Sequence, residues 1–310
     1  MRDQIPSGTK TKRKGKSKVA PRLGREKYVT YLCYVIPGFL LYLALFVSPI
    51  ILGIYYSLFD WNGYSKNMNF IGLNNYLKAL KNVKFKNALL FNLKYSVILI
   101  ICVLILSMIL ALILNKNIKC RTFFRATFFF PAVVSMLAAG LIFNEIFYRA
   151  LPAIGNFFHL SALQSNILSN KNTAMYGVLF VHIWQGVCIP TVLLMSALQT
   201  VPSEVLESSA IDGANKWQQF WRIIVPFLLP TISVILVLLL RDGLMVFDYI
   251  KAMTEGGPGG ATRSITMLIY QQGFEENKFS LAVAESLMLS VILMGISIIQ
   301  IKITQRKEVY

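Results

Sequence analysis

Apolar runs of about 20 residues or more are the feature that most limits how this chain can fold. A helix rises about 1.5 Å per residue, so each run is long enough to cross a hydrocarbon layer of about 30 Å. Of the 310 residues, 55% are hydrophobic and only 15% are charged. A soluble domain of this length needs more polar surface than that to cover its core. The sequence therefore predicts a polytopic, all-α membrane protein.

Six transmembrane helices are predicted, because lipid offers no partner to a backbone amide outside a helix. They cover approximately residues 28–58, 89–114, 123–147, 173–198, 227–250 and 281–301. The prolines within them are expected to kink the helices, and these are Pro37, Pro49, Pro131 and Pro190. The loops at 59–88 and 148–172 are each expected to contain a short interfacial helix.

The formal net charge of +17 is concentrated in tails and loops. Residues 1–27 hold ten of the 31 lysines and arginines and form a basic tail, which is expected to be disordered and to contact anionic lipid. Such a tail before a first span is typical of a topology signal, so no nucleic-acid partner is expected. Arginine is concentrated in the tails and in the loops after the second and fourth spans. This distribution predicts that both termini, including the short tail 306–310, are cytoplasmic.

The sequence lacks the patterns of a metal site, a disulfide framework or a nucleotide site. The four cysteines include no C-x-x-C pair, and the histidines are His159 and His182 alone. Gly15-Lys16-Ser17 has the ending of a phosphate-binding loop, but Lys10 stands where that loop needs its first glycine. We therefore expect no metal, no cofactor and no ATP hydrolysis in this chain.

The segment 201–226, cytoplasmic by the predicted orientation, has the pattern of two short helices joined by a glycine turn. Ser203 is predicted to cap the first helix, with Glu204 at its favourable N-terminal end. Asp212-Gly213 supplies the turn, since glycine adopts a left-handed cap without steric cost. One side of the second helix is predicted to carry Trp217, Phe220 and Trp221. From these residues alone, a rigid docking element and a helix pair lying on lipid are equally favoured.

The spacing within this segment resembles the EAA loop of binding-protein-dependent ABC importer permeases. That loop has the pattern E-A-A, three residues, G, nine residues, I-x-L-P; here the corresponding residues are Glu207-Ser208-Ser209, Gly213 and Ile223-x-Val225-Pro226. The departures are the two serines and the valine. The resemblance implies a coupling loop that docks in a groove of an ATPase, with Glu207 facing that partner. The implied coupling residues are Glu207, Ser208, Ser209, Ala210, Asp212, Gly213 and Pro226.

The resemblance covers about residues 28–305 and is closest to carbohydrate-type permeases. The similar segments are Phe70-Ile71-Gly72-Leu73-Asn74-Asn75-Tyr76, Trp184 through Pro202, Phe247-Asp248, Thr254-Glu255-Gly256-Gly257-Pro258, and Ala282-Val283-Ala284-Glu285-Ser286. They imply a type I ABC importer transmembrane domain. The implied partners are a second permease subunit, two ATPase subunits that hold the ATP and Mg, and an external solute-binding protein. The implied substrate is a sugar or oligosaccharide, with a glycerol-phosphate compound as the alternative.

Charged residues also lie inside the predicted fifth and sixth spans: Arg241, Asp242, Asp248 and Glu285. Each costs about 2.5–3.5 kcal/mol at the centre of a bilayer, so each is expected to face a cavity or a partner. Arg241 and Asp248 are spaced to share one helical face, and a contact between Arg241 and Glu285 is sterically allowed. The two interpretations are a charge pair that fixes helix packing and a translocation path. The path would also be lined by His182, Trp184 and Gln185.

Two other classes of function explain less of the sequence. A secondary transporter also has intramembrane charges, but it does not account for the segment 201–226. A membrane enzyme needs a nucleophile–base pair or a metal cluster, and the sequence has neither pattern. The predicted function is therefore that of a permease subunit in an ATP-driven importer, without an indication of which sugar it carries.

Overall fold

The computed structural model describes residues 25–116 and 121–305, and the chain divides into two compact units, residues 1–52 and 53–310. Two predictions concern residues outside the described ranges, those for the basic tail up to residue 24 and for the terminal segment 306–310. Cys120, one of the four cysteines, also lies outside these ranges.

The described part of the first unit, residues 25–52, is a single helical segment. Helix α1 (Arg25–Tyr42) contains Pro37 and continues through a π-helical turn, η1 (Leu43–Val47), into α2 (Ser48–Ser57), whose last residues belong to the second unit. No residue from 32 to 52 is buried, although most of these side chains are apolar. A helix that is apolar on all sides is suited to an environment of lipid or other membrane helices.

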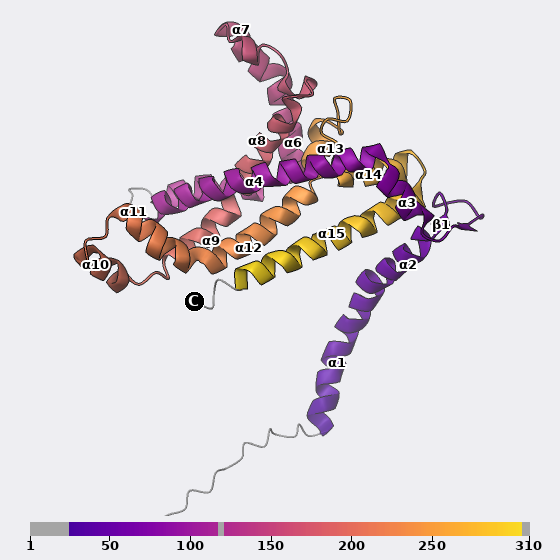
Figure 1. Cartoon of the computed structure of the whole chain (residues 1–310), viewed down its shortest axis with the longest axis horizontal. Helices are drawn as coiled ribbons and strands as arrows, with labels where there is room; N and C mark the ends of the chain where they lie inside the picture. Colours follow the sequence, from indigo (N-terminus) through magenta and orange to yellow (C-terminus); the bar gives the residue numbers. More distant parts are fainter. Residues whose placement is uncertain (1–24, 117–120, 306–310) are drawn as a thin grey trace, which may run out of the picture. The chain divides into compact units, whose positions relative to one another are not determined.

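Long helices that pack side by side form the body of the second unit (Figure 1). Helix α4 (Val83–Asn115) packs against α12 (Val225–Leu244) and α9 (Cys188–Leu198), and α12 also packs against α15 (Phe279–Gln305). In lipid, such contacts stabilise the fold through close packing rather than through removal of water. The buried side chains of the main core include Tyr95, Leu99, Val103, Leu194, Leu228 and Ile235.

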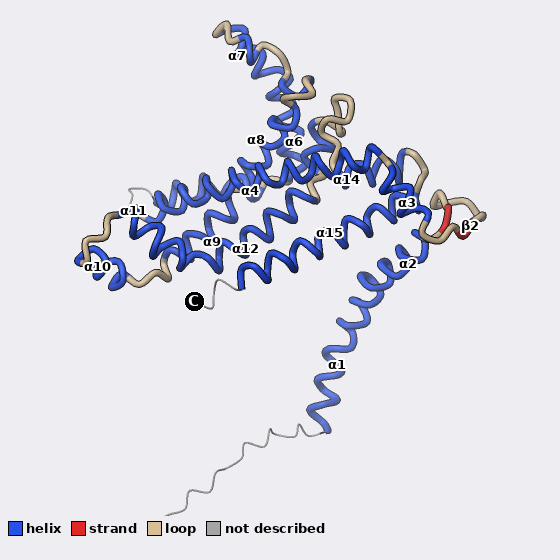
Figure 2. The backbone as a smooth tube through the Cα atoms, in the orientation of Figure 1, coloured by secondary structure: helices blue, strands red, loops and turns tan. Residues whose placement is uncertain are grey.

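A small hairpin and a short helix precede α4. Strands β1 (Phe59–Asp60) and β2 (Asn69–Phe70), red in Figure 2, pair in antiparallel fashion. The buried Asn75 of helix α3 (Asn74–Lys81) donates from Nδ2 to the carbonyl oxygens of Ser57 and Phe59, each at 2.8 Å. This side chain therefore fixes α3 to the end of α2. The helix predicted for the loop 59–88 is present as α3.

The sequence predicts six spans, and the described residues contain five or six. Among the described residues, five helical stretches are long and apolar enough to cross a membrane. Helices α8 (Ala174–Gly186) and α9 form a pair bent by 40°, which makes a sixth if it counts as one span. The break follows Gly186, just ahead of Pro190, which is one of the predicted kink positions.

The predicted third span, 123–147, is wrong in its boundaries. Helix α5 (Arg121–Val133) ends two residues after Pro131, and the chain starts a new helix, α6 (Met136–Glu145). That helix continues without a break to Phe157, through η2 (Ile146–Ala150) and α7 (Leu151–Phe157). The hydropathy of this run does not indicate the interruption, because hydropathy alone does not distinguish one continuous helix from two helices that meet. Two 3₁₀ turns then lead to α8, η3 (Ser161–Leu163) and η4 (Ile167–Ser169).

The predicted fifth span is also interrupted. Helix α12 ends at Leu244, and the chain resumes as α13 (Asp248–Met253), which packs against α6. Helix α14 (Ile265–Tyr270) and a π-helical turn, η6 (Gln271–Glu275), then pack against α15. Short helices and irregular backbone inside a membrane protein are stable only where protein or a water-filled cavity surrounds them.

Candidate coupling loop and membrane cavity

The segment 201–226, which we call the coupling loop after the role that its resemblance implies, begins with helix α10 (Ser203–Ile211). Pro202 holds the cap position, and no side chain caps the helix there, so the predicted capping role of Ser203 is wrong. The reason is that Ser203 is already the first helical residue, one position past the cap. Glu204 occupies the first turn as predicted, which favours its negative charge near the positive end of the helix dipole.

Gly213 ends α10 in the predicted manner. Its φ angle is +84°, a left-handed conformation that costs other residues about 1–2 kcal/mol. The amide of Gly213 donates to the carbonyl of Ala210 at 3.1 Å, and the amide of Ala214 donates to that of Ser209 at 2.9 Å. These two bonds form a Schellman motif, which satisfies the last carbonyl groups of the helix. The turn is therefore built into the local sequence.

The second helix of the coupling loop is held against the first. Asn215 and Gln218 form a reciprocal capping box at the start of α11 (Lys216–Gln219). The side-chain amide of Gln219 donates to the carbonyl of Leu206 at 3.2 Å and to the hydroxyl of Ser209 at 3.0 Å. Ser209, one of the two serines that replace alanine, thus binds within the loop. The coupling loop is a closed helix–turn–helix.

The opposite face of α10 is open. Glu204, Glu207, Ser208 and Ile211 share that face by their helical spacing and are all exposed, with Ile211 at 88%. On α11, Trp217 is 70% exposed. The predicted aromatic grouping is present as ring contacts of Trp221 with Trp217 and Phe220. The remaining predicted coupling residues, Ala210, Asp212 and Pro226, are exposed as well, and Pro226 lies at the start of α12.

A cavity of about 330 Å³ lies where helices are interrupted. Its walls come from the start of α6, the middle of α8, the end of α12 and the start of α13. Irregular backbone between α12 and α13 forms part of the lining, as expected for broken helices that border a cavity. The lining residues are Met136, His182, Arg241, Asp242, Met245, Val246, Phe247, Asp248 and Tyr249.

The structure brings Arg241, Asp242 and Asp248 together around this cavity, and all three are exposed in the isolated chain. The predicted reason for their proximity is wrong, because Arg241 and Asp248 lie on two different helices rather than on one face. The contact that the sequence allowed between Arg241 and Glu285 is not formed. Among the described residues, the Glu285 carboxyl has no hydrogen-bond partner and no ion pair.

The wall behind the cavity is a line of buried polar side chains. The hydroxyl of Tyr95 on α4 is 3.0 Å from Nδ1 of His182, whose ring stacks on Tyr249 with centroids 4.6 Å apart. Tyr249 donates to Oε1 of Gln185 at 2.8 Å, and Gln185 donates from Nε2 to the carbonyl of Val134 at 2.6 Å. Gln185 therefore satisfies the irregular backbone between α5 and α6 and has a structural role at this position.

Trp184 is placed differently from the other predicted path residues. It does not line the cavity, and its ring packs edge-on against Phe143 of α6 with centroids 5.1 Å apart. Of the path residues predicted from the sequence, His182 and the three charged residues border the cavity. Trp184, Gln185 and Glu285 do not.

Sequence reasoning missed Asn92 and Gly243, which organise the end of α12. The buried Asn92 donates to the carbonyls of Gly243 and Leu244, at 3.2 and 2.7 Å, and accepts from the amide of Ile265 at 2.9 Å. A Cβ atom on Gly243 would lie 2.8 Å from the Cα of Ser96. A lone asparagine inside an apolar span was the signal that could have pointed to this junction.

Comparison with known proteins agrees with this arrangement. Residues 103–308 match the family described as "Binding-protein-dependent transport system inner membrane component". The match covers more than half of the chain, and the chain therefore belongs to this family. It is a non-catalytic, multi-pass permease of a transport system in the inner membrane, and the predicted family is confirmed.

Individual relatives match over nearly their full length. The multiple sugar-binding transport system permease protein MsmF of Streptococcus mutans is 40% identical over 92% of this chain and 98% of its own. The probable starch degradation products transport system permease protein AmyD of Thermoanaerobacterium thermosulfurigenes is 32% identical over 91% and 96%. A solved bacterial ABC transporter for the polysaccharide alginate matches with a TM-score of 0.77, 19% identity and coverage of 91% and 96%, which confirms the predicted fold.

Proposed function

We propose that this permease carries a sugar or an oligosaccharide across the membrane, as one subunit of an ATP-driven importer. Its partners in the proposal are a second permease subunit, two ATPase subunits that hold the ATP and Mg, and an external solute-binding protein. The names of the relatives that share 40% and 32% of their residues with the chain support a carbohydrate substrate. The observation that carries the coupling role is the outward face of the closed helix–turn–helix.

The coupling loop suits a docking role because its shape is fixed before any partner binds. Hydrogen bonds from Gln219 and the capping box set the angle between α10 and α11. A preorganised element loses little conformational entropy on binding. The exposed face combines apolar Ile211 with the carboxylate of Glu207, which is suited to a groove with an apolar floor and a polar rim.

The cavity at the broken helices is the proposed path for the substrate. Two carboxylates and one guanidinium provide hydrogen-bond acceptors and donors for hydroxyl groups, and Tyr249 and Phe247 provide apolar ring surface. The cavity is bordered by two acidic side chains and one basic side chain, and this excess of acidic groups favours a neutral sugar over a phosphate anion. A sn-glycerol-3-phosphate permease of Agrobacterium fabrum is a relative at 26% identity, but the charge of this cavity does not favour its substrate class.

The proposed orientation places both termini and the coupling loop in the cytoplasm, and it rests on the arginine distribution. A cysteine introduced at the exposed Lys66 should react with an impermeant thiol reagent added to intact cells, in a background without native cysteines. A cysteine at the exposed Lys216 should react only after the membrane is opened. Labelling of position 216 from outside would contradict both the orientation and the coupling role.

Nucleotide hydrolysis tests whether the ATPase activity belongs to the partner subunits rather than to this chain. The purified chain alone should hydrolyse no ATP, whereas the assembled complex in lipid nanodiscs should hydrolyse ATP faster when sugar-loaded binding protein is added. The matched control is the same complex with binding protein that carries no sugar. Hydrolysis by the single chain, or a complex that ignores the loaded binding protein, would overturn the proposal.

A further inference from the structure

Helix α15 contains a carboxyl group that is fully enclosed by protein. Glu285 is 0% exposed, and neither of its two oxygens has a hydrogen-bond partner among the described residues. It lies six residues after the start of α15 and does not border the cavity at the broken helices. Nothing in the proposed transport or coupling roles uses this group.

A polar neighbour of Glu285, Gln272, also has a buried oxygen without a hydrogen-bond partner among the described residues. The side chain of Gln272 on η6 is 2% exposed and lies beside the carboxyl without forming a hydrogen bond of good geometry. Its Oε1 atom also has no partner in the described part of the chain. Three acceptor oxygens without a hydrogen-bond partner thus belong to neighbouring buried side chains from two elements, and the one donor group that these two side chains carry is Nε2 of Gln272.

Packing within this chain encloses the pair, with Glu285 0% and Gln272 2% exposed. Ala282, Glu285 and Leu289 share one face of α15 by their spacing. On that face, a Cβ atom on Gly273 of η6 would lie 3.3 Å from the Cβ of Ala282, and Leu289 packs with Ile265 of α14. Whatever compensates the carboxyl must therefore be small enough to lie inside this packing.

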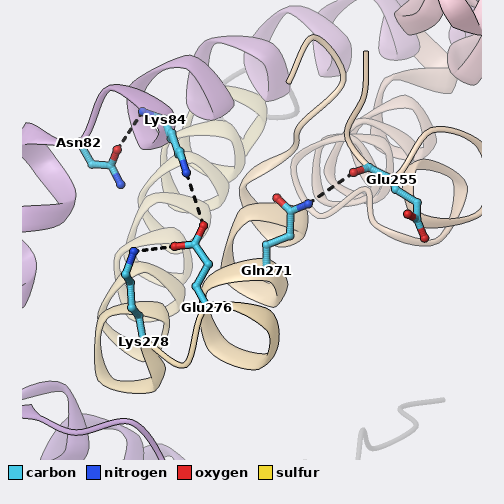
Figure 3. Close-up of polar contacts among 6 residues, drawn as sticks. All are labelled: Asn82, Lys84, Glu255, Gln271, Glu276 and Lys278. Atoms are coloured by element: carbon cyan, nitrogen blue, oxygen red, sulfur yellow. Dashed lines mark hydrogen bonds and ion pairs between the residues drawn. The ribbon is translucent and has the colours of Figure 1, made fainter. Parts of the chain in front are cut away.

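Charged side chains in the described ranges, 25–116 and 121–305, do not compensate it. Glu276 lies at the end of η6 and is the charged group whose field acts on Glu285. Figure 3 shows that Lys84 and Lys278 both turn to Glu276, with nitrogen–oxygen distances of 3.4 and 2.6 Å. The other charged or titratable groups on the elements around α15 form no ion pair with Glu285, and they are Asp60, Tyr76, Lys78, Lys81, Lys86, Lys94, Tyr95, Arg241, Asp242, Tyr270 and Glu275.

An ionised carboxylate enclosed without a partner is strongly destabilising, so a native fold that contains one implies a compensating positive charge. We propose that Glu285 and Gln272 form a buried binding site for one small monovalent cation, either a proton or a sodium ion. A proton on Glu285 provides an O–H donor for Oε1 of Gln272. A sodium ion takes the carboxylate and amide oxygens as ligands, which are the oxygen donors that hard cations prefer.

Infrared difference spectroscopy on the assembled importer in lipid nanodiscs tests the proton. Without sodium and at neutral pH, the spectrum of the wild type minus that of Glu285→Gln should contain the C=O band of a protonated carboxylic acid. Gln272→Leu should shift this band to higher frequency, because the acid then loses its acceptor. Gln is close in shape to a protonated Glu, so Glu285→Gln should disturb the packing little. If Glu285→Gln nevertheless assembles poorly, the band shift in Gln272→Leu provides a second measurement.

Thermal unfolding of the same complex in sodium chloride and in choline chloride tests the sodium ion. If sodium occupies the site, the wild type should unfold at a higher temperature in sodium, and Glu285→Gln should lose that shift. Glu275→Gln, an exposed change on η6, is the matched control and should behave as the wild type. The band assigns a proton, and the sodium shift assigns sodium. Absence of both would overturn the proposal, because the carboxylate would then be ionised and empty.

Discussion

The coupling loop and the cavity at the broken helices are built in opposite ways. In the coupling loop, the hydrogen bonds that set the shape join residues at most 13 positions apart, such as Gln219 and Leu206. Around the cavity, Asn92 binds residues more than 150 positions away, and Tyr249 binds Gln185 at a separation of 64. A local element can hold its shape while it moves, whereas the cavity depends on the positions of several helices at once.

This difference matches the two proposed tasks. A docking element must transmit force without deforming, and short-range bonds provide that. A path must open and close, and a wall assembled from α4, α8, α12 and α13 changes when any of these helices shifts. Variants that weaken the long-range junction should therefore affect the whole fold, and variants in the loop should affect the partner interaction alone.

The largest effect is expected for Gly243→Val. A Cβ atom there would lie 2.5 Å from the Oγ and 2.8 Å from the Cα of Ser96, so α4 and α12 must separate. Overpacking of this kind costs about 3 kcal/mol or more when backbone has to move. Thermal unfolding of the complex should show a large loss, or the protein should fail to accumulate. The control is Gly295→Val on α15, where a Cβ atom meets nothing within 4 Å; equal behaviour of the two variants would contradict the account.

The next effect is expected for Asn92→Leu. The change removes the partner of two carbonyls and one amide at the ends of α12 and α14. We expect a loss of about 1–3 kcal/mol of stability and poor transport, because the backbone at the cavity loses its support. Asn87→Leu changes an exposed asparagine on the same helix and should have little effect. The unfolding temperatures of both variants, measured in lipid nanodiscs, check this.

The sequence could predict local features and could not predict the long-range junction. The turn at Gly213 and the amphipathic pattern of the coupling loop follow from neighbouring residues, and the structure contains both. The interruptions at residues 134–135 and 245–247 do not change the hydropathy of the runs that contain them, so the spans were predicted as continuous. The partners of Asn92 lie more than 150 residues away, and no local rule identifies them. Local prediction also has limited precision at helix ends. Ser203 was predicted as the cap, but the helix begins one residue earlier than predicted, so Ser203 is its first residue.

A moderate and specific effect is expected for Gly213→Leu. No atom of the described residues lies within 4 Å of a Cβ at this position, so the cost there is the left-handed backbone, about 1–2 kcal/mol. The loop should distort and bind the ATPase more weakly, while the unfolding temperature of the spans stays close to that of the wild type. Gly213→Asn is the matched control, since asparagine tolerates the left-handed region better. Capture of the ATPase on beads by each variant measures the difference.

The smallest effect is expected from the ion pairs in Figure 3. The ammonium group of Lys278, and then that of Lys84, lowers the pKa of Glu276 below its ordinary range. The resulting stability is present above the ordinary pKa and is lost as the pH falls through the lowered value. Because these groups are partly exposed, the contribution should stay below about 1 kcal/mol. Glu276→Gln should therefore flatten the acid side of the stability profile slightly, and an unchanged profile would contradict the pairing.

The division of labour between the two regions is tested most directly by ATPase capture and sugar uptake, measured together for Gly213→Leu and Arg241→Gln. The account predicts that Gly213→Leu reaches the membrane but loses both ATPase capture and uptake. Arg241→Gln should capture the ATPase normally and lose uptake, because its guanidinium borders the cavity and not the loop. Normal capture and uptake by Gly213→Leu, or lost capture by Arg241→Gln, would contradict the separation of coupling from transport.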